Sequence, residues 1–320
     1  MKKYYELSSG VYNERQLIEA EIWCSVQKFF YHGKNATSYK FIFFKALIEN
    51  IADVTAHNEV TFKKVFDSFT AIAWNLVACH HLEQSSMNSK KAAVQRIIED
   101  FQKSYDIPDE WSYEKINLEQ REVISKQIKR VGKVNVVGAT FGDFNEEIYS
   151  FDKKTEIIKM NPLYIEFILK YKRMLVDVNN YQFALYLDKN NSSEKGSGLL
   201  AKIETVSKRS SLKEFEVILR QTGVNECFYC QKKIISAHVD HFIPWSYVQN
   251  DCLWNFVLAC PSCNTKKSDK LAHETYLHLL IERNKKLRVQ KNCKIYFESY
   301  HEDKLIKSYK YAQQNGFKRL

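Results

Sequence analysis

Two Cys-x-x-Cys pairs constrain this chain more than any other feature of its sequence. They read C-F-Y-C at 227–230 and C-P-S-C at 260–263, with 29 residues between them. A Cys-x-x-Cys turn presents two thiolates to one edge of a metal ion, and two such turns complete a closed tetrahedral shell of four sulfurs. A redox motif needs only one such pair. The pattern therefore predicts a structural zinc ion bound by Cys227, Cys230, Cys260 and Cys263.

Polar residues between and just after the two pairs suggest hydrolytic chemistry. Asp240 and His241 stand at the end of an expected strand, in V-D-H-F-I-P-W at 239–245. Neighbouring strand residues point to opposite faces, so this pair needs a bend to serve one site. Asn255 lies in a partly apolar stretch, and Asn264 is expected in the first turn of a short helix. The zinc-bound turns would fix the elements that carry these groups.

The segment Cys227–Leu271 resembles the HNH endonucleases, also called ββα-metal nucleases. The resemblance implies that His241 is the general base, that Asp240 binds the catalytic metal, and that Asn255 is the central Asn that holds the His241 loop. Asn264 occupies the place of the last His of the family, which gives an H-N-N pattern. Oxygen ligands from Asp240 and Asn264 favour Mg²⁺ or Mn²⁺ over Zn²⁺ at this site.

Three lysines close to Asn264 are candidates for contacts with nucleic-acid phosphates. They are Lys266, Lys267 and Lys270, and Lys267 best matches the usual basic position of the family. A solvated face is the alternative interpretation for all three.

The positive charge of the chain is concentrated in its last part. Residues 201–320 carry 21 Lys+Arg against 12 Asp+Glu, a net charge of +9, out of +10 for the whole chain. Basic surface beside a metal site indicates a polyanionic partner. With the resemblance, this predicts DNA as the partner and substrate. An even spread of charge would have favoured simple solubility.

The remaining sequence predicts an α+β protein in two domains. Residues 1–198 are expected to form a mainly helical recognition or partner-binding domain, and residues 199–320 the C-terminal ββα-metal HNH domain with its zinc knuckles. The clearest linker is the polar stretch 190–198. Expected elements are helices over most of 1–36, over 61–81, from Pro162 to about Leu187 and over Glu274–Leu287, a strand at Val134–Val137, and a hairpin around Asp152-Lys153-Lys154.

Two apolar segments resemble the helical N-terminal halves of HNH proteins from bacterial restriction and phage-defence loci. They are S-Y-K-F-I-F-F-K-A-L-I at 38–48 and A-I-A-W-N-L-V at 71–77. The resemblance implies a recognition or partner-binding half in a DNA endonuclease of restriction or anti-phage defence, with a defence-system protein as a candidate partner. Because one metal centre cuts one strand, double-strand cleavage would need a homodimer or two successive nicks.

The sequence predicts a cytoplasmic protein without membrane association. The start, Met1–Glu6, lacks the apolar run of a signal peptide, and no stretch approaches 18 uncharged apolar residues. Thiols in that compartment stay reduced and available to metals.

Two other functions fit the same residues. An RNA-cleaving HNH-type toxin would use the same site chemistry. A non-catalytic zinc-knuckle module could bind nucleic acid without cutting it, but such a module needs neither the Asp240-His241 step nor the two asparagines.

Overall fold

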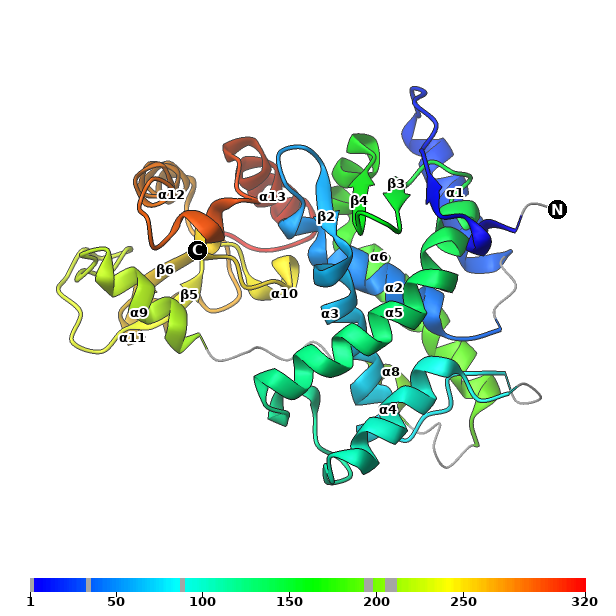
Figure 1. Ribbon diagram of the computed structural model, residues 1–320. Coiled ribbons are helices and arrows are strands. Elements are labelled where there is room, and N and C mark those ends of the chain that lie inside the picture. Colours follow the sequence, from blue (N-terminus) through cyan, green and yellow to red (C-terminus); the bar gives the residue numbers. More distant parts are fainter. Residues whose placement is uncertain (1–2, 33–35, 87–89, 193–197, 205–211) are drawn as a thin grey trace. The chain divides into compact units, whose positions relative to one another are not determined.

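The computed structural model describes residues 3–32, 36–86, 90–192, 198–204 and 212–320. The chain divides into two compact units (Figure 1). Unit 1 comprises residues 1–50, 58–168 and 174–208, and unit 2 comprises residues 51–57, 169–173 and 209–320. Among the described residues, no helix is both long enough and apolar enough to cross a membrane.

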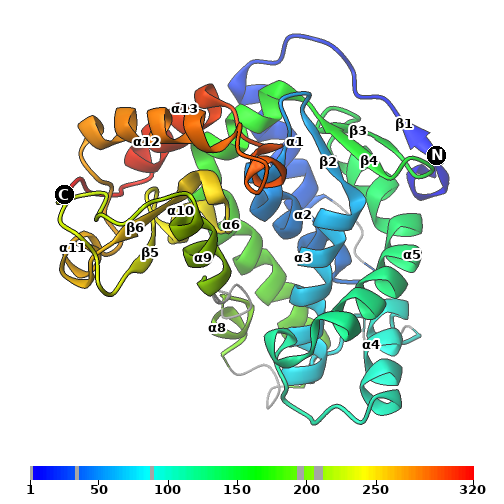
Figure 2. The same cartoon turned by 60° about the vertical axis from the view of Figure 1, so that its left-hand side comes forward.

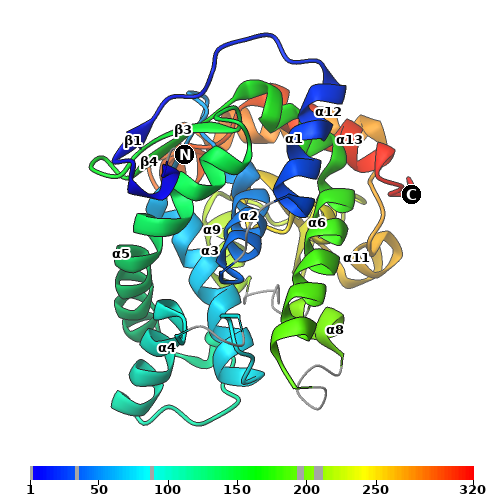
Figure 3. The same ribbon diagram turned by 90° about the vertical axis from the view of Figure 1, so that its right-hand side faces the viewer.

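Unit 1 is a helical layer built around the apolar helix α2 (Tyr39–Glu49). Phe41 of α2 stacks on Phe183 of α6, and Phe43 of α2 lies against Phe66 of α3. Helix α2 is therefore buried between neighbours on both sides (Figure 3). The helices that belong wholly or mostly to unit 1 are α1 (Glu19–Tyr31), α2, α3 (Phe62–Trp74), α4 (Ala93–Ser104), α5 (Leu118–Asp143), α6 (Pro162–Asn190) and α8 (Leu199–Glu204).

A small antiparallel sheet covers part of this helical layer. Its strand order is β1-β3-β4-β2, from β1 (Ser9–Gly10), β3 (Tyr149–Asp152), β4 (Ile157–Met160) and β2 (Glu59–Thr61). In the β3–β4 hairpin, Phe151 pairs with Ile158, and both side chains are buried. Alternation of buried and half-exposed residues along β3 fits a sheet with one face on a core.

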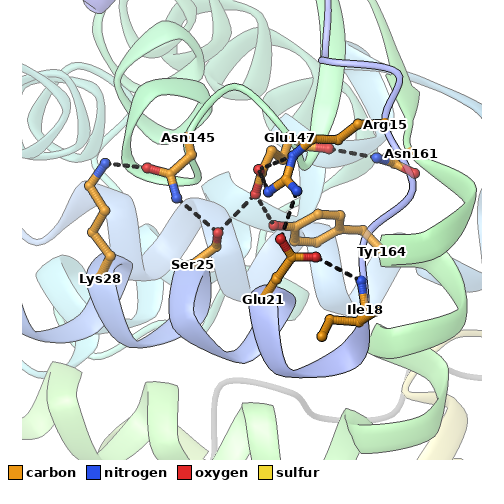
Figure 4. Close-up of polar contacts among 9 residues, drawn as sticks. All are labelled: Arg15, Ile18, Glu21, Ser25, Lys28, Asn145, Glu147, Asn161 and Tyr164. Atoms are coloured by element: carbon orange, nitrogen blue, oxygen red, sulfur yellow. Dashed lines mark hydrogen bonds and ion pairs between the residues drawn. The ribbon is translucent and has the colours of Figure 1, made fainter.

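A buried carboxylate ties α1 to the loop before β3. Glu147, which is 4% exposed, accepts hydrogen bonds from Arg15, Ser25 and Tyr164 (Figure 4). Asn145, two residues earlier, bonds Lys28 and Ser25 on the same helix. A buried charge is stable only when it is paired and hydrogen-bonded, and this network meets both conditions.

Unit 2 combines a two-stranded sheet with helices. Its elements are α9 (Lys213–Gln221), β5 (His238–His241), α10 (Trp245–Val248), β6 (Phe256–Ala259), α11 (Pro261–Lys267), α12 (Glu274–Leu287) and α13 (Glu302–Gln314). Strands β5 and β6 pair antiparallel, and α11 packs beside β5 (Figure 2). A short 3₁₀ turn, η6 (Lys294–Phe297), lies between α12 and α13.

Two short segments that precede residue 209 in the sequence, 51–57 and 169–173, belong to unit 2. The buried ammonium of Lys304 donates to the carbonyls of Ala52, Val54 and Ser299. The hydroxyl of Tyr247 donates to the carbonyl of Leu169 at 2.6 Å. These bonds use backbone groups of 51–57 and 169–173 as acceptors for side chains of the C-terminal part.

Several elements expected from the sequence are confirmed. Helix α6 begins at Pro162 after the capping Asn161, the β3–β4 hairpin turns at 153–156, and α12 has the expected bounds. The expected helix over 61–81 is α3 followed by one π-helical turn, Asn75–Cys79. Five residues of the expected linker, 193–197, lie outside the described part of the chain.

Two expectations for unit 1 are wrong. Val134–Val137 lies inside α5 and is not a strand. The expected helix over most of 1–36 is reduced to α1 and a single turn at Tyr4–Glu6, and β1 lies between them. Ile18 is 67% exposed and lies just before α1 begins.

Candidate active site

The four cysteines form one compact cluster. Their sulfur atoms all lie within 4.8 Å of one another, and the Sγ atoms of Cys230 and Cys260 are 3.9 Å apart. A tetrahedral ion with Zn–S bonds of about 2.3 Å places its sulfurs about 3.8 Å apart. The donor type and spacing therefore fit a structural zinc site.

Local backbone geometry presents these sulfurs. The first pair lies in a hairpin closed by the Cys227 amide donating to the Lys232 carbonyl, with Gln231 in a left-handed conformation, φ 58°. The second pair lies at the start of α11, where Cys260 is the N-cap. Burial opposes ionisation of Cys227, but backbone N–H groups of Cys230, Cys260 and Tyr229 lower its pKa to about 7. This thiol is therefore prepared to become a thiolate ligand.

Asp240 is a buried carboxylate, and its partner Tyr229 lies between two cysteines of the cluster in the sequence. Its Oδ2 accepts a hydrogen bond from the Tyr229 hydroxyl at 2.5 Å, and Lys267 Nζ lies 3.2 Å from Oδ1 and 3.1 Å from Oδ2. Burial raises the pKa of Asp240, and the Lys267 charge opposes that shift. A carboxylate offers about four lone-pair positions, so these three contacts leave room for a metal ligand bond.

His241 has a partner that the sequence did not indicate. Its Nε2 lies 3.0 Å from Oδ1 of Asp251, and its ring meets Phe256 edge-on with 4.6 Å between ring centroids. The imidazole is 5% exposed. Asp251 was not among the predicted site residues. It stands ten residues after His241, across the loop that contains α10, so no simple spacing rule joins the two.

Asn255 fixes the chain just after His241. Its side-chain amide is fully buried, accepts from the Ile243 amide and donates to the Ile243 carbonyl, both at 2.9 Å. Its own carbonyl accepts from the Phe242 amide at 2.8 Å. Three hydrogen bonds thus hold Phe242 and Ile243, the two residues that follow His241.

Asn264 and the predicted lysines lie on or just after α11. The Asn264 amide nitrogen lies 3.1 Å from Nδ1 of His238, which brings the start of α11 next to β5. Lys266 and Lys270 are exposed, whereas Lys267 is 2% exposed and also donates to the carbonyl of His241 at 2.7 Å.

A cleft of about 540 Å³ brings three of the predicted site residues together, whereas the fully buried Asn255 does not line it. Asp240, His241 and Asn264 all line it. The other lining residues are Leu212, Val239, Pro244, Trp245, Ser246, Thr265, Ser268 and Asp269. Carboxylate and amide oxygens facing one polar cleft are the donors that Mg²⁺ and Mn²⁺ prefer. The residues present therefore fit a hard divalent cation.

Comparison with known proteins identifies this segment. Residues 227–273 match the family model described as HNH endonuclease. No curated protein and no solved structure matches the chain. The matched residues span the zinc cluster, the Asp240-His241 strand, Asn255 and α11. Residues 227–273, which contain the four-cysteine cluster, are therefore similar to the HNH endonuclease family.

Proposed function

We propose that this protein is a divalent-metal-dependent endonuclease that hydrolyses phosphodiester bonds in DNA. The observation that supports this proposal is the single cleft lined by Asp240, His241 and Asn264, with His241 oriented by Asp251. In this proposal the cleft presents a base and two oxygen ligands, and Asp251 orients the base. A binding module does not need this arrangement.

His241 is the general base in this proposal. Because its Nε2 lies on the Asp251 carboxylate, its Nδ1 is the nitrogen left to accept a proton from the attacking water. Asp251 fixes the orientation and tautomer of the ring, as a carboxylate does in other acid–histidine pairs. Asn255 keeps the following backbone in place, so the ring is held from two directions.

Asp240 and Asn264 would hold Mg²⁺ or Mn²⁺. When bound there, the ion supplies positive charge that offsets the charge developing on the scissile phosphate. The contacts of Lys267 support a role in positioning Asp240 and the His241 carbonyl. Its predicted phosphate contact stays a prediction. Lys266 and Lys270, being exposed, are better placed to bind adjacent phosphates.

The decisive experiment is cleavage of supercoiled plasmid with Mg²⁺ or Mn²⁺ by the full chain and by His241→Ala. We expect nicking by the wild type and a loss of roughly 100-fold or more in the variant, because a general base contributes about that much. His278→Ala is the matched control, since His278 is an exposed histidine on α12. Equal nicking by wild type and His241→Ala would refute the proposal, as would no nicking under either metal.

Substrate and cellular role need separate tests. Competition between duplex DNA and RNA distinguishes the DNA endonuclease from an RNA-cleaving toxin. We place the protein in restriction or anti-phage defence because of the resemblance of its N-terminal half. The cytoplasmic location stays a prediction from the sequence. Phage plating on cells that express wild type or His241→Ala tests that role. Protection by the wild type alone would support it, and equal plating on both would contradict it.

A further inference from the structure

A second basic feature lies outside the segment matched by the family model. Residues 283–297 contain six Lys and Arg and no Asp or Glu. Arg283 turns inward, where it donates to the carbonyls of Trp254 and Phe256. The other five cations are exposed and form the basic segment 285–294: Lys285, Lys286, Arg288, Lys291 and Lys294.

Most of this segment is not neutralised by the protein itself. Lys285 pairs with Glu282 at 2.9 Å and with Glu302 at 3.5 Å. No carboxylate in the described part of the chain forms an ion pair with Arg288, Lys291 or Lys294. These three cations therefore remain available to an external anion.

Helix polarity explains only the start of the segment. A helix C-terminus favours cations, and Lys285 and Lys286 lie in the last turn of α12. Lys291 and Lys294 lie after that helix ends at Leu287, so its dipole does not require them.

A chain of aromatic contacts connects the basic segment to the cleft. The His241 ring lies 4.6 Å from Phe256, Phe256 lies 4.7 Å from Phe215 of α9, and Phe215 lies 5.9 Å from Tyr296 of η6, measured between centroids. Lys294 begins η6. The Tyr296 hydroxyl also donates to Glu214 at 3.0 Å. The three steps together place the Tyr296 ring at most about 15 Å from the His241 ring. That is the length of about four to five base pairs at a rise of about 3.4 Å, so the end of the basic segment at η6 lies within reach of DNA bound at the cleft.

We propose that the basic segment 285–294 binds the phosphates of duplex DNA that flank the cleavage site. This inference rests on the proposed function and adds a substrate-binding surface to it. Arg288, Lys291 and Lys294 contact backbone phosphates, so they contribute affinity without choosing a base sequence. Duplex RNA and acidic proteins are the competing ligands.

The test measures binding without cleavage. In the His241→Ala background, a labelled 25-base-pair DNA duplex is titrated by fluorescence anisotropy at several salt concentrations. The triple variant Arg288→Gln/Lys291→Gln/Lys294→Gln should bind every sequence more weakly. Its slope of log K against log salt should fall by about 0.9 for each phosphate that the variant no longer neutralises, about 2.7 in total.

Two control variants make the result specific. Lys103→Gln/Lys115→Gln/Lys154→Gln removes three exposed lysines from unit 1 and should leave affinity and slope unchanged. Arg288→Lys/Lys291→Arg/Lys294→Arg keeps the charge and should retain the slope, which excludes misfolding as the cause. An unchanged slope in the glutamine triple overturns the inference, as does an equal fall in the unit 1 triple. The inference is also overturned if the glutamine triple binds duplex RNA, titrated in the same way, more weakly but keeps its affinity for duplex DNA.

This design can refute the proposed binding surface and the proposed nuclease function separately. If the slope depends on the segment but wild type never nicks plasmid, the proposed function is wrong and the DNA-binding surface remains. If wild type nicks and the slope is unaffected, only the binding surface is wrong.

Discussion

At the residue scale, the histidine–aspartate pair is the most informative feature of the cleft. The Asp251 side chain is 20% exposed, whereas His241 is nearly buried. The pair therefore joins a loop carboxylate to a ring that is already confined by Phe256. In the proposed mechanism, a ring held in this way would need little reorganisation to accept a proton.

Replacement of Asp251 tests this pairing. We expect Asp251→Asn to lower kcat by roughly 10- to 100-fold with little change in KM, because orientation of the base matters only as the proton moves. Asp251→Glu should recover part of the loss. A rise in KM at constant kcat would show that Asp251 binds substrate and does not position His241.

The cysteine cluster gives a prediction about metal content. Cys227→Ser should lower bound zinc from about one ion per chain to near zero and lower the melting temperature, since a structural zinc ion contributes to folding. Metal analysis and calorimetry measure both quantities. His241→Ala should keep its zinc, and comparable zinc loss in the two variants would contradict the separate roles of these residues.

At the scale of elements, the sequence was most informative where chemistry dictates spacing. The cysteine pairs, the position of Asn264 in α11 and the bounds of α12 follow from local patterns. The predicted strand at Val134–Val137 is wrong because β-branched residues favour strands only weakly. Tertiary packing decides whether such a segment is a strand or part of a helix. Within the helix that contains them, Gly138 permits close backbone approach: a Cβ there would lie 2.0 Å from the Tyr4 carbonyl oxygen.

Local sequence patterns could not predict that Asp251 is the partner of His241 or that Lys267 is buried. Both depend on how loops fold back across β5, and this is set by contacts distant in sequence. The predicted roles of the cleft residues and the domain boundary at 198/199 stay predictions.

An ion pair between α2 and α5 gives a prediction about pH. Lys40 Nζ lies 3.7 Å from Oδ2 of Asp143. Burial lowers the pKa of Lys40, and Asp143 opposes that shift. Asp143→Asn should destabilise the protein by about 1–3 kcal/mol at pH 7, because the buried ammonium of Lys40 loses its carboxylate partner.

The sign of the pH effect follows from proton binding. In the native protein the pKa of Lys40 lies below its unfolded value of about 10.4. Loss of the Asp143 charge should lower the native pKa further. Between the native and the unfolded pKa, the unfolded chain binds more protons than the native chain. Stability of the variant relative to wild type should therefore rise between pH 7 and pH 10. Urea unfolding measures it. Lys40→Met/Asp143→Asn should lack this dependence, and a relative stability that falls with pH would contradict the assignment.

At the scale of the whole molecule, the described residues contain one Asp240–His241–Asn264 centre per chain. In the proposed function, one such centre would hydrolyse one strand at a time. We expect supercoiled plasmid to become nicked circles first, with linear DNA appearing later and faster at higher protein concentration if chains pair. Agarose gels over time follow both products. Linear DNA formed at once, at a rate independent of protein concentration, would contradict action by separate chains.

The acceptors of Lys304 have a consequence for synthesis of the protein. Its ammonium bonds carbonyls made about 250 residues earlier, at Ala52 and Val54. A ribosome therefore releases 51–57 long before the side chain that completes their hydrogen bonding exists, and such distant pairings form slowly. A nascent chain lacks a finished unit 2 until its last helix emerges, and residues 199–320 expressed alone would leave that ammonium buried with two of its three acceptors gone.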